Sequence, residues 1–484
     1  KGFSAAFEDS CRAHATALAM IDPPDAPVTF ANLFFTVIAF AEALQDHGVT
    51  AGNLVSVHVG DPIAGVALKL ALLRIGATAI GPVPREGRGG TLGVDWHLVV
   101  AGGDVPGPRE IPVGRAWIRS PRRGVPIQPG GAMVRMTSGT TGTPKLRLIS
   151  DAGLLARALR GQELRGSLDE PVFIGYAPGS SPFFNYMARA VLSGVLQLHP
   201  GRDDAANLRA MAAQGVTTAL LSPWNFRRLL AAVEAGAPPP ASLRRILVGG
   251  GEVAPAFAAR AEALFGAEVV LCYGSNETGS IAHARPAERP DLPGRVGEPY
   301  PDFGYRFTDD SGAAADPATG GELWLRVPPE IRVTDYPSGR SLTDAEGWVA
   351  TGDICRRLGD GALQFLGRRA EFLNIGGNKR APQWFEAALQ GQPGVADVAA
   401  FRLPDPGGGD IAGLAVVPGP GFDAGLLTAQ LAERLGPRYL FRLLAVDAIP
   451  VTAAGKTDRA RLSQAFHPKD PPDPRPEPAI HKEP

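Results

Sequence analysis

Near the middle of the chain, a strand, a glycine-rich turn, a helix and a second strand follow one another directly. Ile246–Val248 is a short apolar run typical of a buried strand, and Gly249–Gly251 follows it. The next segment, Pro255–Phe265, begins with a proline suited to a helix start and stops at Gly266. Val269–Leu271 then begins another strand. This order predicts a βαβ unit, which belongs to a parallel sheet covered by helices.

The same alternation occurs upstream, and a different pattern begins downstream. Ala205–Gln214 is a predicted helix that leads into a predicted strand. From 290 to 366, short alternating runs lie between Gly, Pro and Asp turns, which predicts a small antiparallel, β-barrel-like subdomain. We expect an α/β fold whose large N-terminal domain of parallel, helix-covered sheets comprises residues 1–367. A small mobile α+β domain is expected at 371–466.

Charge and cysteine content exclude several classes of protein. The 484 residues include 48 Lys+Arg and 49 Asp+Glu, so we expect no nucleic-acid partner, which would usually require a basic excess. Three cysteines without a Cys-x-x-Cys pair argue against a disulfide framework or a thiolate metal site. Because uninterrupted apolar runs stay below the ~18 residues of a membrane helix, a cytoplasmic protein is predicted. The proline-rich segment 467–484 is predicted to be disordered.

The densest cluster of hydroxyl residues is Thr137-Ser138-Gly139-Thr140-Thr141-Gly142-Thr143-Pro144-Lys145, which follows the apolar segment Ala132–Met136. Its two glycines let the backbone approach a ligand, its hydroxyls donate hydrogen bonds, and its lysine adds positive charge. A phosphate chain suits this combination. The loop is not a Walker A motif, because its second glycine is followed by Thr-Pro. Gly455-Lys456-Thr457 also fails, since position 450 is proline, and P-loop phosphoryl transfer is therefore disfavoured.

This loop resembles the signature of the AMP-forming adenylate synthetases, a superfamily of acyl- and aryl-CoA ligases, peptide-synthetase adenylation domains and beetle luciferase. Further motifs of the superfamily follow in the expected order: Tyr273-Gly274-Ser275-Asn276-Glu277, Gly321-Glu322-Leu323-Trp324, Thr351-Gly352-Asp353, Gly367-Arg368 and Pro450–Arg459. The resemblance implies an AMP-forming acyl- or aryl-CoA ligase that uses ATP, Mg²⁺ and CoA.

The resemblance also implies a role for each matched residue. By this likeness the nucleotide site comprises Thr137, Ser138, Gly139, Thr140, Thr141, Gly142, Lys145, Gly250, Tyr273, Gly274, Asn276, Asp353 and Arg368. The loop holds the β- and γ-phosphates, the ring of Tyr273 stacks on adenine, and Asp353 binds the ribose hydroxyls with help from Arg368. Glu277 and Thr141 are the implied Mg²⁺ ligands, since a hard ion beside phosphate prefers oxygen.

Lys456 is the implied catalytic lysine, with Glu277 as its partner in catalysis. A carboxylate that attacks the α-phosphorus builds negative charge on phosphate oxygens. A mobile ammonium therefore binds the transition state better than the ground state.

The acid is expected beside Phe184, Asn185, Gly249 and Ser275, where the superfamily has its acyl site. Asn185 stands where amino-acid-activating relatives carry an aspartate for the substrate ammonium, so an α-amino acid is disfavoured. A hydrophobic carboxylic acid is the expected substrate. The aromatic residues of this segment are equally expected as part of the core.

Departures from the superfamily pattern lie mainly at the domain hinge. Ala370 stands where the superfamily usually has Asp or Lys, and Asn374 stands where lysine is common. Gly377 still matches the glycine that lines the thiol tunnel. Asn276 replaces a common threonine, but its amide can donate to phosphate. The departures thus bear on the thioester step more than on adenylation.

Three hypotheses follow. The first is an acid–thiol ligase that forms an acyl adenylate and pyrophosphate and then an acyl-CoA thioester. The second is a stand-alone adenylation enzyme that loads a separate carrier protein. The third is a non-catalytic nucleotide-binding homologue.

Overall fold

The computed structural model describes residues 1–22, 27–83, 92–100, 109–137, 145–165, 168–177, 180–201, 203–375, 378–404, 410–436, 439–452 and 456–466. They form two compact units, each described by itself below. The first unit comprises Lys1–Thr351, Cys355–Phe365 and Ala453–Lys456; the second comprises Gly352–Ile354, Leu366–Thr452 and the chain from Thr457 onward. The tail predicted at 467–484 lies outside the described residues.

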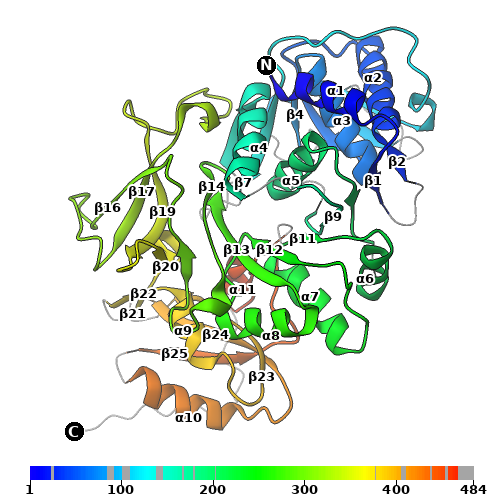
Figure 1. The fold of residues 1–484 in the computed structure, drawn as a ribbon. Helices are drawn as coiled ribbons and strands as arrows, with labels where there is room; N and C mark the ends of the chain where they lie inside the picture. The colour runs from blue at the N-terminus through cyan, green and yellow to red at the C-terminus, as the bar shows by residue number, and fades with distance from the viewer. Residues whose placement is uncertain are drawn as a thin grey trace. The chain divides into compact units, whose positions relative to one another are not determined.

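One sheet of the first unit, here called the central sheet, holds the predicted βαβ segment (Figure 1). In spatial order its strands are β14 (Gly279–Ala284), β13 (Glu268–Ser275), β12 (Arg245–Gly249), β11 (Thr218–Leu221), β9 (Val172–Ile174), β10 (Gln197–Leu198), β1 (Leu18–Ile21) and β2 (Val28–Thr29). The strands from β13 to β1 run parallel, whereas the outer strands β14 and β2 pair antiparallel. The parallel arrangement confirms the expected fold class.

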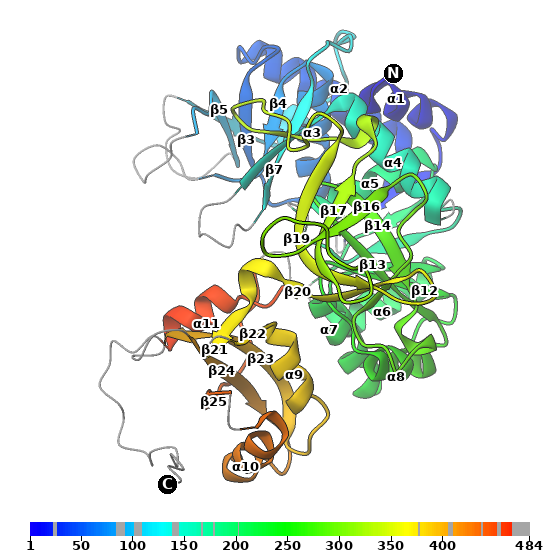
Figure 2. The same cartoon turned by 90° about the vertical axis from the view of Figure 1, so that its left-hand side faces the viewer.

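A second sheet of the same unit, the N-terminal sheet, carries the hydroxyl-rich loop between two of its strands. Its order is β18 (Thr334–Asp335), β8 (Lys145–Ser150), β7 (Ala132–Thr137), β4 (Thr78–Ile80), β3 (Leu54–His58), β5 (Trp96–Val100) and β6 (Glu110–Val113). Helices α1 (Phe3–Ala13), α2 (Phe30–Asp46) and α3 (Pro62–Arg74) pack together beside this sheet (Figure 2). Their buried aromatic and aliphatic side chains form one continuous core with it.

The region predicted to be rich in strands forms a third sheet. Its order is β15 (Arg295–Gly297), β20 (Leu363–Arg368), β19 (Trp348–Arg357), β17 (Gly321–Arg326) and β16 (Gly304–Thr308). The pairs β15/β20 and β16/β17 are antiparallel, as the alternating sequence predicts.

Helices that border the candidate site begin at residues with side chains suited to capping. Ser180 accepts a hydrogen bond from the Phe183 amide at the start of α5 (Ser181–Leu192), and Ser222 caps α7 (Pro223–Glu234) in the same way. Helix α8 (Pro255–Phe265) has the predicted bounds and ends at Gly266, whose φ of 65° favours glycine. Two further helices, α4 (Asp151–Arg165) and α6 (Asp204–Ala213), complete the set in this unit.

The second unit has its own core. It contains the hairpin β21 (Leu373–Ile375) and β22 (Asn378–Arg380), a sheet of β23 (Val395–Pro404), β24 (Asp410–Pro418) and β25 (Phe441–Ala445), and helices α9 (Pro382–Leu389), α10 (Ala424–Leu435) and α11 (Arg459–Ala465). Leucine and phenylalanine side chains from these elements form a separate buried cluster. None of the helices within the described ranges is long and apolar enough to cross a bilayer.

Candidate active site

Strands β7 and β8 bring the two ends of the hydroxyl-rich loop side by side. The strands are antiparallel, and Thr137 at the end of β7 is the Cα partner of Lys145 at the start of β8. Lys145 is exposed there. Ser138, Gly139, Thr140, Thr141 and Gly142 lie outside the described residues. The strands on either side of the predicted phosphate-binding residues are therefore paired directly with each other.

The motif from Tyr273 to Glu277 lies at the turn between β13 and β14. A Cβ on Gly274 would lie 2.3 Å from the Gly279 carbonyl oxygen, so only glycine allows the two strands to pair this closely. The Ser275 and Thr278 hydroxyls lie 2.9 Å apart and are hydrogen-bonded within the turn. The half-buried ring of Tyr273 lies on β13, as expected for a residue that offers an aromatic face beside a strand end.

Glu277 is held by an arginine from the N-terminal sheet. Its carboxylate lies 3.2 Å from Nε of Arg147, and the same guanidinium contacts Asp335 at 2.6 Å. The Glu277 side chain keeps 27% of its surface exposed, so one carboxylate face remains accessible. Among the described residues, no three His, Cys, Asp or Glu side chains gather into a metal site. A single carboxylate still fits Mg²⁺, which protein sites commonly hold through one or two carboxylates plus substrate phosphates.

The turn after β12 forms a flat backbone wall. The Tyr176 hydroxyl donates a hydrogen bond to the Leu221 carbonyl at 2.6 Å and accepts one from the Gly249 amide at 3.1 Å. One phenol therefore fixes the ends of β11 and β12 relative to each other. The residues Gly249–Gly251 of this turn are called the wall below.

Lys456 belongs to the first unit and lies beside this wall. A Cβ built on Gly250 would lie 3.6 Å from Cε of Lys456, and the φ of Gly250 is +95°. A Cβ on Gly251 would lie 2.9 Å from Cγ of Pro223. The wall is thus confined on both sides, and the ammonium side chain reaches the end of the central sheet.

Asp353 and Arg368 lie together in the second unit. Nε of Arg368 is 2.7 Å from Oδ1 of Asp353, and the Asp353 side chain is buried at 3% exposure. The guanidinium of Arg368 therefore holds this buried carboxylate through a charge-assisted contact.

The hinge segment near Ala370 is anchored within the second unit. Ala370 lies in a short 3₁₀ turn with Glu371, whose carboxylate pairs with Arg459 at 3.3 Å. Arg459 also contacts Glu386 at 2.7 Å. Gly377 lies outside the described residues.

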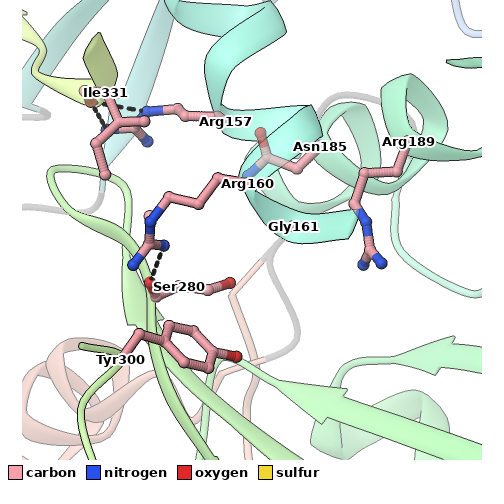
Figure 3. Close-up of a pocket in the computed structure, with 9 residues that line it drawn as sticks. Arg157, Arg160, Gly161, Asn185, Arg189, Ser280, Tyr300 and Ile331 are labelled. Atoms are coloured by element: carbon pink, nitrogen blue, oxygen red, sulfur yellow. Dashed lines mark hydrogen bonds between the residues drawn. The ribbon is translucent and has the colours of Figure 1, made fainter. Parts of the chain in front are cut away.

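The two residues predicted for the acid site on α5 face different ways. Phe184 is 2% exposed and packs edge-on against Phe3, with ring centroids 6.1 Å apart, so its ring is part of the core. Asn185 instead lines a small cavity between α4 and α5 (Figure 3). The structure thus favours the core alternative for the phenylalanine.

Sequence reasoning missed a set of buried arginines, three of which line this cavity. They are Arg135 on β7, Arg147 on β8, Arg157 and Arg160 on α4 and Arg189 on α5. The spacing of Arg157 and Arg160 is i,i+3 among leucines and alanines, which places both on one helix face. That spacing was the available signal. Arg135 interrupts a run that otherwise predicts a purely apolar strand.

Residues 98–331 match the family model described as AMP-binding enzyme. A fatty acid–[acyl-carrier-protein] ligase of Mycobacterium marinum is 29% identical, with 68% of this chain and 67% of that protein aligned. A salicylyl-CoA synthase/salicylate adenylyltransferase of a Streptomyces species is 32% identical, over 68% of this chain and 62% of that protein. The matches therefore span about two thirds or less of the length of these curated relatives.

The fold has close counterparts among solved structures. The crystal structure of ATP-bound MatB from Rhodopseudomonas palustris superimposes with a TM-score of 0.80 at 18% identity, covering 96% of this chain and 99% of that one. At this identity the likeness establishes the fold, which is the α/β arrangement predicted.

Proposed function

We propose that the chain is an AMP-forming adenylate synthetase that activates a carboxylic acid with ATP and then transfers the acyl group to CoA. In the first step a carboxylate oxygen bonds to the α-phosphorus and the bond to the β-phosphate oxygen breaks, which releases pyrophosphate. In the second step the CoA sulfur bonds to the acyl carbon, AMP leaves, and the thiol proton passes to solvent.

The observation that supports this proposal best is the position of Lys456. Its side chain lies beside Gly250, in the same unit as Glu277 and the two strands that flank the hydroxyl-rich loop. A positive charge at this strand end is positioned to stabilise negative charge that develops during attack on phosphorus. Lys145 and the loop hydroxyls would bind the departing pyrophosphate.

The other matched side chains take the roles that the resemblance implies. In the first unit, Tyr273 would offer its ring to adenine and the wall at Gly249 would carry the acid; in the second unit, Asp353 and Arg368 would bind the ribose. Glu277 would supply the protein's carboxylate to Mg²⁺, with Arg147 orienting it. The bound ion would add positive charge against the phosphate oxygens.

We assign the protein to the cytoplasm, since Cys11, Cys272 and Cys355 are free thiols.

Acid-dependent exchange of labelled pyrophosphate into ATP tests the adenylation step. We expect Lys456→Ala to slow exchange about a hundred- to a thousandfold, as for loss of one positioned charge donor. Lys379→Ala, a change of the same size on the exposed strand β22, should leave exchange unchanged. Unchanged exchange in Lys456→Ala would refute this role for the lysine. Absence of exchange with a broad panel of acids would favour a non-catalytic nucleotide-binding protein.

A carrier protein is the alternative acceptor. Ala370 at the hinge and the likeness to the mycobacterial acyl-carrier-protein ligase both favour it. Preformed acyl adenylate is incubated with CoA and, separately, with candidate carrier proteins. The rates of thioester formation distinguish the two acceptors. Faster thioester formation on a carrier than on CoA would replace the CoA step and leave adenylation as proposed.

A further inference from the structure

The cavity beside Asn185 is lined by three arginine side chains among neutral residues. Figure 3 shows Arg157 and Arg160 extending from α4, with Asn185 and Arg189 on neighbouring turns of α5. Its volume is about 30 Å³, enough for one or two groups the size of water. The wall opposite the helices comes from β14 and Tyr300.

The two arginines of α4 are engaged by the fold. Arg157 donates to the Ile331 carbonyl at 2.7 and 3.0 Å and to the carbonyls of Asn276 and Glu277 at 2.9 and 2.8 Å. Arg160 forms a two-pronged pair with Asp302 at 2.5 and 2.7 Å. These two side chains shape the cavity but do not call for a ligand.

Arg135 differs from them. It is 4% exposed, and its Nη2 donates to Oδ1 of Asn185 at 2.8 Å. Among the described residues, its Nε and Nη1 are buried without a hydrogen-bond partner. Native proteins rarely leave buried donors unpaired, so these atoms indicate an acceptor that arrives with a ligand.

The charges around Arg135 are also unbalanced. Burial, together with the nearby charge of Arg157, lowers the pKa of Arg135 to about 9. Burial and the charge of Arg135 lower the pKa of Lys69 to about 8. The neighbouring carboxylates are engaged elsewhere: Glu277 and Asp335 by Arg147, and Asp302 by Arg160.

Arg189 supplies a second guanidinium to the cavity. Its side chain is 1% exposed and lies 6.0 Å from the ring centroid of Tyr186. Helix α5 therefore presents Arg189 one turn after Asn185, which already holds Arg135. The guanidiniums of Arg189, which lines the cavity, and of Arg135, which is bonded to the cavity residue Asn185, suit a planar anion, because their donors match the oxygens of a carboxylate.

The cavity is connected to the proposed reaction site through short contacts. Tyr186 stacks on Tyr176 with centroids 5.7 Å apart and planes 16° apart, and Tyr176 binds the Gly249 amide. Gly279 and Ser280 line the cavity and pair in register with Ser275 and Gly274 of the nucleotide motif. Residues that line the cavity are thus paired with, or adjacent in sequence to, residues that contact the proposed reaction site.

We propose that the acid activated by this enzyme carries a second, remote carboxylate, which binds in this cavity against Arg189 and the Arg135–Asn185 pair. The inference rests on the proposed adenylation activity and specifies its substrate class. It replaces the hydrophobic acid expected from sequence with a dicarboxylic acid.

Matched pairs of acids test the proposal on the wild-type enzyme. Pyrophosphate exchange is measured with linear and aromatic dicarboxylic acids and with the monocarboxylic acids in which methyl replaces the remote carboxylate. We expect kcat/KM to favour the dicarboxylic member about ten- to a hundredfold, the effect of a charged hydrogen-bonded pair. Equal kcat/KM for both members overturns the cavity proposal alone. Exchange with neither series overturns the adenylation proposal as well.

Two variants test whether the preference for dicarboxylic acids arises at this cavity. Arg189→Met should reduce kcat/KM for the dicarboxylic acid at least tenfold and change that for the monocarboxylic acid little. Arg244→Met, the same change at a side chain that is 72% exposed, should leave both unchanged. A dicarboxylate preference that survives in Arg189→Met would overturn the assigned site. If this variant does not fold, the wild-type comparison still decides the substrate class.

Discussion

The buried arginines of α4 and those nearest Asn185 show how one residue type serves two purposes. Arg157 and Arg160 are bound to backbone carbonyls and to Asp302, whereas Arg135 retains buried donors that the fold does not use. All three are at most 9% exposed. Burial alone therefore does not separate a structural cation from a binding cation. What separates the two is whether each buried N–H group of the guanidinium has a hydrogen-bond partner in the fold.

Arg157→Met should have the largest effect on stability. The change leaves the Asn276, Glu277 and Ile331 carbonyls without their buried donor, so we expect a loss of about 3–5 kcal/mol in the free energy of unfolding. Urea-induced unfolding measures it, with Arg244→Met as the surface control. If Arg157→Met has the same unfolding midpoint as the wild type, the distinction between arginines that stabilise the fold and arginines that bind a ligand is wrong.

His199 is a further buried basic side chain, and unlike the arginines it can become neutral by losing its proton. It is 1% exposed and lies beside Phe183, and burial lowers its pKa to about 4. The unfolded chain binds a proton at His199 below a pKa of about 6.5, but the folded chain does so only near 4. Stability is therefore full above pH 6.5 and falls between pH 6.5 and 4, by up to about 3 kcal/mol.

Unfolding measured across this pH range checks the prediction for His199. The variant His199→Leu should lack this part of the pH dependence. The same slope in wild type and variant would show that the imidazole does not stay neutral in the fold.

Arg135→Met should have the smallest effect, and in the opposite direction. Without ligand, the change removes a desolvated charge that repels Arg157 and Lys69, so we expect stability unchanged or raised by about 1 kcal/mol. Thermal unfolding of the ligand-free protein measures it. A loss above about 2 kcal/mol would place Arg135 with the structural arginines of α4.

The parts of the fold that depend on local pattern could be predicted from sequence. Helix α8 has the predicted bounds because a proline start and a glycine stop are local signals. The short alternating runs predicted over 290–366 likewise contain the strands β16 and β17, because alternation is a local signal. The motif from Tyr273 to Glu277 was found by resemblance, and its turn needs glycine at position 274.

The proposed acid side of the site could not be predicted in this way. Phe184 and Asn185 are adjacent in sequence, and only the packing of α5 against α1 and α4 decides which one faces the cavity. Arg135 and Asn185 are fifty positions apart, so their hydrogen bond is a product of tertiary structure. Local periodicity carries no information about such a pair.

The wall after β12 restricts which substitutions positions 249–251 can accept. Any side chain at position 249 would meet the Tyr176 hydroxyl, and one at 251 would meet Pro223. The backbone at 250 adopts a conformation that other residues rarely accept. Descendants that acquire new substrates would therefore be expected to accumulate their changes on α5, while the stretch from 249 to 251 drifts little.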